Sequence, residues 1–238
     1  MKEIRRFMLI NILFAPLFCQ AQINNGYQVL GNIEGLSDGT KVYLIDGNKR
    51  KPIDSATVSQ NQFTLNGSLV EPAHMYLHAG RGPAAKKLAD ILLDNRKIYV
   101  KGNTPDYDSV SVVGSDIDQQ WKQWYKEDQH IGYQRYRIKQ VHESLITKND
   151  ITNASLLGKL IEEMQIDRIN LLKAYVKQHH DTAVGAALPM LCTLSDYLTG
   201  ADYTEMYNML TPIRQQSAFG KDILVQAKRK GDRPKVAK

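Results

Sequence analysis

Cysteine is scarce in this chain of 238 residues, which holds only Cys19 and Cys192. No C-x-x-C motif occurs, so the sequence excludes the paired thiols on which dithiol redox chemistry depends. Cys192 stands in the apolar stretch AALPMLCTLS, among Leu188, Leu191 and Leu194, with no cation or histidine beside it. A reactive thiolate would need such a neighbour, whereas a free cysteine in apolar company is typical of a core. We therefore predict a structural role for Cys192.

Motifs for catalysis or ligand binding are absent as well. The sequence has no G-x-x-x-x-G-K-[ST] or G-x-G-x-x-G phosphate loop and no G-x-S-x-G nucleophile motif. His179 and His180 are adjacent, and neighbours on a helix point about 100° apart, so they are poorly placed to share a metal ion. His74 and His78 lie in a segment typical of a strand, where this spacing is too long for a compact site. We predict no catalytic residue, no cofactor and no metal.

The N-terminal segment, residues 1–21, has the pattern of a secretory signal peptide. Three cations among the first six residues precede an uncharged stretch at 7–18, which is shorter than the about 20 residues of a membrane-spanning helix. We place cleavage between Ala21 and Gln22, and we expect a periplasmic or secreted protein with no transmembrane segment after cleavage.

Cys19 leaves a second possibility for this segment, because a lipoprotein is cleaved before a cysteine that then carries lipid. That processing requires a small residue before the cysteine, and Phe18 occupies the position here. We therefore favour export without a lipid anchor.

The positive charge of the chain lies at its ends. Of the net charge of +6, residues 1–21 carry +2 and residues 221–238 carry +5, which leaves −1 for residues 22–220. We expect 221–238 to be a solvated basic tail. Nucleic-acid binding requires cations clustered on a folded surface, and the nearly neutral body excludes it.

Residues 22–115 are rich in predicted strands. Short runs of alternating apolar and polar residues are separated by turns of Gly, Asn and Asp. The runs at 56–59 and 62–65 predict a hairpin with Phe63 and Leu65 on one face. Because no long helical pattern interrupts these runs, we expect an antiparallel β-sandwich or an open barrel.

A helical domain is predicted from residue 116 to 220. Ser115 and Asp118 have the spacing of a helix N-cap, and Trp121 and Trp124 then begin an apolar stripe with three- and four-residue spacing. Asp128 and, further on, Arg135 interrupt the stripe, so we expect it to border solvent or a partner there.

More helices follow the first one. We expect them at about 153–179, at 182–198 with a kink or a break at Pro189, at 202–212, and after Ser217. Strands followed by helices predict an α+β fold.

Several stretches resemble one family of exported proteins. The runs GNIEGLSDGTKVYLID and SATVSQNQFTLNGSLVEP are similar to an N-terminal β-domain of unknown function. That domain occurs in thioredoxin-like and peroxiredoxin-like thiol–disulfide oxidoreductases of Gram-negative bacteria of the Bacteroidetes type. YVKQHHDTAVGAALP and YNMLTPIRQQSAFGKDI are similar to the helical connector of that family. The resemblance implies a redox domain with W-C-x-x-C after the connector, and no residue of this chain matches that motif.

The resemblance and the absent cysteines favour a non-catalytic accessory module. Its partner would be a periplasmic thiol–disulfide oxidoreductase or a second copy of the chain, bound at open strand edges and at Trp121, Trp124 and Tyr125. A one-cysteine peroxidase that uses Cys192 is an alternative, and a shortened remnant of a reductase is another.

Overall fold

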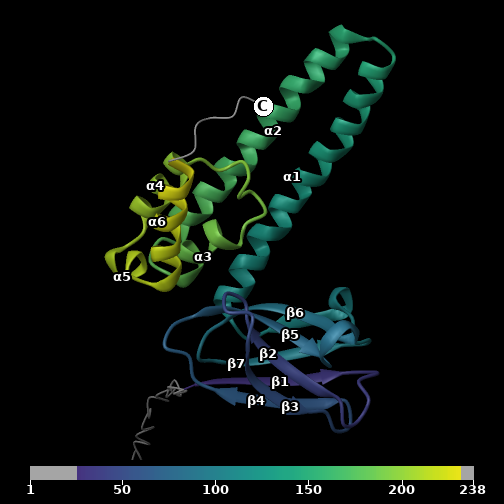
Figure 1. Cartoon of the computed structure of the whole chain (residues 1–238), viewed down its shortest axis with the longest axis vertical. Helices are drawn as coiled ribbons and strands as arrows, with labels where there is room; N and C mark the ends of the chain where they lie inside the picture. The colour runs from purple at the N-terminus through teal and green to yellow at the C-terminus, as the bar shows by residue number, and fades with distance from the viewer. Residues whose placement is uncertain (1–25, 232–238) are drawn as a thin grey trace, which may run out of the picture.

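A computed structural model describes residues 26–231 of the chain. Its first part consists of two four-stranded sheets, and helices follow, so the predicted α+β class is confirmed (Figure 1). The eight strands are β1 (Tyr27–Ile33), β2 (Lys41–Asp46), β3 (Pro52–Thr57), β4 (Gln62–Gly67), β5 (Ala73–Ala79), β6 (Lys86–Leu93), β7 (Lys97–Gly102) and β8 (Val110–Val113). Short 3-10 turns at Gly82–Ala84 and Tyr107–Ser109 precede β6 and β8.

The strand order is β4-β1-β7-β8 in one sheet and β3-β2-β5-β6 in the other. Five of the six strand pairs are antiparallel, as expected, but β1 and β7 run parallel, with Gln28 opposite Lys97 and Ile33 opposite Gly102. A parallel pair requires a long crossover, and here it consists of the strands between β1 and β7.

The predicted hairpin of residues 56–59 and 62–65 is wrong, because the two runs belong to different sheets. β3 pairs with β2 and β4 pairs with β1, so only a single bridge, Ser59 to Gln62, connects the runs. Gln60 and Asn61 both have positive φ angles, and the chain passes from one sheet to the other at this tight turn. Phe63 and Leu65 do share a buried face, as predicted.

The two sheets enclose one apolar core. Alternate residues of β1 and β4 point inward, which is the pattern of strands with one buried face. Gly31 has no side chain where the Phe63 ring crosses β1, and an added Cβ would lie 2.0 Å from that ring. The aromatic ring therefore fills the space between the sheets that a larger residue at 31 would occupy.

The second part of the chain contains six helices within the described residues. They are α1 (Asp116–Thr147), α2 (Ile151–Gln178), α3 (Ala183–Leu191), α4 (Gly200–Met209), α5 (Pro212–Gln215) and α6 (Ala218–Gly231). α1 and α2 form a long antiparallel hairpin that extends away from the rest of the molecule (Figure 1). None of the helices in residues 26–231 is long and apolar enough to cross a membrane.

The helix ends confirm some predictions and correct others. Ser115 caps α1 by accepting a hydrogen bond from the Asp118 amide, as predicted. α3 ends at Leu191, two residues after Pro189, and so does not reach residue 198. α4 starts at Gly200, two residues before the expected start, because Thr199 and Asp202 form the capping box.

α6 includes residues 221–231, which we had expected to belong to a solvated tail. Phe219 and Ile223 anchor this helix in the helical core. Its last turn carries Lys228, Arg229 and Lys230, whose positive charges interact favourably with the negative end of the helix dipole. The rest of the predicted tail lies outside the described residues, as does the predicted signal peptide.

Asp118 attaches the start of α1 to the β-sandwich. Its carboxylate accepts a hydrogen bond of 2.9 Å from the Leu92 amide of β6 and one of 2.6 Å from Lys122 Nζ. Burial raises the pKa of Asp118, and Lys122 opposes this shift. Leu92 itself belongs to the helical core, so the end of β6 and the first turns of α1 share one buried contact.

Candidate functional site

Both tryptophans of the predicted partner surface on α1 are buried, so they offer little area to a partner. Trp124 is 0% exposed and Trp121 is 7% exposed, both in the core between the helices and β6. Tyr125 is half-buried and lines a hollow beside Trp121. Aromatic residues at helical spacing look alike in sequence whether they face a core or a partner, so the burial of these two could not be read locally.

Two adjoining hollows separate the β3-β2-β5-β6 sheet from the helices. The larger has a volume of about 660 Å³ and the smaller about 230 Å³, and they share His74, Tyr76 and Leu191. His74 and Tyr76 point away from the sandwich core because they alternate along β5 with the buried Met75 and Leu77. The cleft thus lies on the outer face of this sheet, next to the end of α3.

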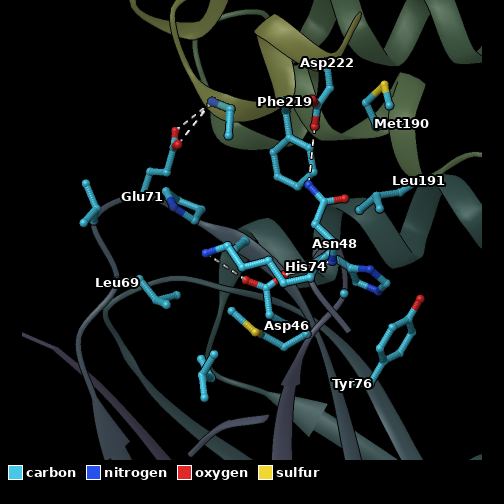
Figure 2. A pocket seen from close by; sticks show the side chains of 18 of the residues that line it. Asp46, Asn48, Leu69, Glu71, His74, Tyr76, Met190, Leu191, Phe219 and Asp222 are labelled. Carbon is cyan, nitrogen blue, oxygen red and sulfur yellow. Dashed lines mark hydrogen bonds and ion pairs between the residues drawn. The ribbon is translucent and has the colours of Figure 1, made fainter. Parts of the chain in front are cut away.

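The larger hollow has one wall from the β-sandwich and one from the helices. Figure 2 shows Asn48 and Glu71 on strand-connecting loops, facing Phe219 and Asp222 of α6. The Ala218 amide donates to both oxygens of Glu71 at 3.1 Å, so this carboxylate caps α6. The Asn48 amide donates to Asp222 at 3.4 Å. These contacts connect the two parts of the protein across the cleft.

The smaller hollow contains a cluster centred on Asp90. Lys87 Nζ lies 2.6 Å and Tyr107 Oη 2.8 Å from Asp90 Oδ2, and His74 Nε2 lies 3.4 Å from Oδ1. Burial alone would raise the pKa of Asp90, but contacts from His74, Lys87 and Tyr107 stabilise the carboxylate and lower the pKa to about 2. Burial, together with Asp90, raises the pKa of Tyr107.

Three buried polar atoms of residues that line this hollow have no hydrogen-bond partner within residues 26–231. They are Trp121 Nε1, His74 Nε2 and Asp90 Oδ1. The 3.4 Å contact between His74 Nε2 and Asp90 Oδ1 does not have hydrogen-bond alignment. Buried polar atoms are rarely left without a hydrogen-bond partner, so a ligand that reaches these atoms could supply one.

His74 and His78 lie on the same face of β5, as their spacing predicted, with the Tyr76 ring between them. The His74 and Tyr76 ring centres are 4.8 Å apart, and those of Tyr76 and His78 are 6.1 Å apart. In the described part of the chain, no group of three His, Cys, Asp or Glu side chains is arranged to hold a metal ion.

Cys192 follows the last residue of α3 and is partly buried, with its Sγ donating to the Pro189 carbonyl at 3.4 Å. Burial raises the pKa of the thiol to about 11. At pH 7 only about one thiol in 10,000 would then be ionised. Because the thiolate is the nucleophilic form, this environment disfavours the alternative of a one-cysteine peroxidase.

A second candidate surface lies on the outer part of the α1–α2 hairpin, residues 129–167, which we call the distal arm. Asp128 and Arg168 form an ion pair where the distal arm begins. The Arg168 guanidinium donates two hydrogen bonds of 2.7 Å to the fully buried Asp128 carboxylate. Thr193 donates to the same carboxylate at 3.1 Å. The sequence had suggested that the stripe borders solvent or a partner at Asp128. Asp128 instead forms its ion pair inside the protein.

Many large apolar side chains of the distal arm are exposed. Of its residues, only Ala154 and Gln165 are buried. Ile131, Ile138 and Leu145, the predicted apolar stripe, face α2 but are only half-buried. The exposed side chains are Tyr133 (61%), Tyr136 (57%), Val141 (54%), Ile146 (50%), Ile151 (60%), Leu156 (59%), Leu160 (38%) and Ile166 (56%).

The fold and these two surfaces define an α+β protein with an N-terminal β-sandwich, an outer cleft and a projecting helical arm. Residues 27–121 match the family described as "Domain of unknown function (DUF4369)". The match covers all eight strands and the first turns of α1, including Trp121. No curated protein matches the chain.

Proposed function

We propose that this protein is an exported, non-catalytic module that binds a protein partner through the distal arm, and that the partner is a second copy of the same arm. The observation that carries the proposal is the number of large apolar side chains that are exposed on residues 129–167. Extensive exposed apolar surface marks an interaction site more often than single exposed residues do.

The geometry of the arm favours a helical partner. Two helices alone cannot enclose a core, so the seam of Ile131, Ile138 and Leu145 stays half-buried. Leu156 and Leu160 are one turn apart on α2, and both are exposed. Two such hairpins packed together form a four-helix bundle, in which the seams of both become the core. A two-fold axis would bring the same surface of both copies together.

Export and the absence of catalysis rest on other features. The basic start and short apolar stretch of residues 1–21 support export. The raised pKa of Cys192 and the lack of a C-x-x-C motif support a role without thiol chemistry.

The oligomeric state of the chain from Gln22 onward tests the proposal. We expect light scattering after size exclusion to give a dimer for the wild type and a monomer for the double variant Leu156→Lys, Leu160→Lys. Val225→Lys is the matched control, because Val225 is an exposed apolar residue (62%) of α6, off the arm, and this variant should stay dimeric.

A wild type that remains monomeric at about 100 μM, well above the dissociation constants of stable dimers, would overturn self-association. A dimer that persists in the double variant would place the interface elsewhere. Unchanged circular dichroism of the variant would show that charge on an exposed surface, and not unfolding, caused the dissociation.

A further inference from the structure

The smaller hollow combines properties that indicate a ligand site independent of the distal arm. It lies between β5, β6 and α1, has a volume of about 230 Å³, and shares His74 and Tyr76 with the larger hollow. Drug-sized ligand sites are typically about 300–1,000 Å³, so this space fits one small ring. A longer ligand could continue into the larger hollow.

The charges of the hollow cancel within the protein. Lys87 is paired with Asp90 at 2.6 Å, and Lys122 is paired with Asp118 at 2.6 Å. Each ammonium therefore already has a carboxylate counter-charge, and the Asp90 carboxylate has Lys87 as its own. A charged ligand would have to displace one of these pairs, so the site favours a neutral one.

The unpartnered atoms of the hollow require both donors and acceptors from a ligand. Trp121 Nε1 can only donate, whereas Asp90 Oδ1, as a carboxylate oxygen, can only accept. His74 Nε2 can do either, depending on its tautomer. Hydroxyl groups match this set, because each of them donates one hydrogen bond and also accepts.

Aromatic rings supply the remaining walls. Tyr76, Tyr107, Trp121 and Tyr125 all line the hollow. The face of an aromatic ring is electron-rich, so it attracts weakly positive C–H groups. A sugar ring presents such C–H groups on its faces and hydroxyl groups around its edge, and it therefore complements both the rings and the unpartnered atoms.

We propose that this hollow binds a neutral carbohydrate, one ring of which contacts Trp121 and Tyr107 and hydrogen-bonds to Trp121 Nε1, His74 and Asp90. Trp121 and Trp124 are the two tryptophans of the chain, and both have an indole N–H without a partner within residues 26–231. Only Trp121 lines the hollow, and Trp124 lies in the core. The pair therefore provides a matched test.

The experiment uses the chain from Gln22 onward. It measures the affinity for each sugar by tryptophan fluorescence and by titration calorimetry. The probes are glucose, galactose, mannose, N-acetylglucosamine and maltose, each up to about 20 mM, a range that includes weak millimolar binding. Trp124→Phe leaves Trp121 as the sole tryptophan, and its emission should shift on binding. Trp121→Phe keeps an aromatic ring but removes the N–H donor, and affinity should fall about tenfold, as the loss of one good hydrogen bond predicts.

Two further measurements can overturn the proposal. Asp90→Asn should also weaken binding, while glucuronate and glucosamine, which carry opposite charges, should bind more weakly than glucose. Failure of every neutral sugar to bind, or equal affinity in wild type, Trp121→Phe and Asp90→Asn, would contradict a carbohydrate site here. Tighter binding of glucuronate would show that the site is an anion site. Melting curves of each variant separate loss of binding from loss of folding.

Discussion

The α1–α2 hairpin has a root, residues 116–128 and 168–178, and the distal arm, residues 129–167. These two regions belong to the same two helices but bury their side chains very differently. At the root, Trp121, Trp124 and Leu172 are at most 7% exposed, because β6 and α3 pack against them. In the distal arm each helix contacts only the other along most of its length, and apolar residues remain outside. One pair of helices is thus built into a core at one end and exposes apolar surface at the other, where we propose that a partner binds.

The largest expected effect comes from the root. Trp124→Ala should lower the free energy of unfolding by about 3–5 kcal/mol, because it removes a fully buried indole and leaves a cavity. Ile138→Ala, in the half-buried seam of the distal arm, is the control and should cost much less. Urea denaturation of both variants measures the difference. If both variants lost the same free energy of unfolding, the root and the distal arm would not differ in their contribution to stability.

The boundary between the two regions should be almost as sensitive. Arg168→Ala leaves the buried Asp128 carboxylate without its counter-charge, and we expect a loss of about 3 kcal/mol in unfolding free energy. The double variant Asp128→Leu, Arg168→Leu should recover part of this loss, since no buried charge then remains. Thermal unfolding of both proteins measures the recovery. Equal stability of Arg168→Ala and the double variant would mean that the buried Asp128 carboxylate does not need its counter-charge.

Asp90, where the β-sandwich meets the root, should make stability depend on pH. Its folded pKa of about 2 lies below the usual 3.8, so the charged form stabilises the fold above pH 4. We expect about 1 kcal/mol after allowance for solvent screening, lost as the pH falls from about 4 towards 2. The difference in unfolding free energy between wild type and Asp90→Asn should shrink over this range. A difference that stays constant with pH would contradict the lowered pKa.

The smallest expected effect concerns Cys192, which lies next to the root. A water-soluble thiol reagent should label this residue slowly at pH 7 in the folded protein, and faster as the pH approaches 11. Denatured protein, labelled under the same conditions, gives the reference rate. Rapid labelling of the folded form would revive the enzymatic alternative.

Local signals in the sequence predicted local structure well. The Ser115 cap, the shared face of Phe63 and Leu65, and the strand character of His74 to His78 each depend on residues close together in the chain. These features follow from capping and from the two-residue period of a strand, which act over a few positions.

Contacts between distant residues explain what the sequence did not predict. Asp128 pairs with Arg168, 40 positions away, so its local context suggested a solvent border. Asp90 meets His74 and Tyr107 only because β5, β6 and the turn before β8 come together. The one available signal was the alternation of His74, Tyr76 and His78, which predicts a polar and aromatic strand face. Their partners on that face are determined by tertiary packing.

The parallel pairing of β1 with β7 has a consequence for the order of events during folding. Residues 27–33 are synthesised early, yet one edge of this strand remains without hydrogen bonds until residues 97–102 exist. The β5–β6 hairpin, in contrast, closes within a short loop and can form as soon as it is made. We therefore expect the first strand to be among the last parts of its sheet to become fixed.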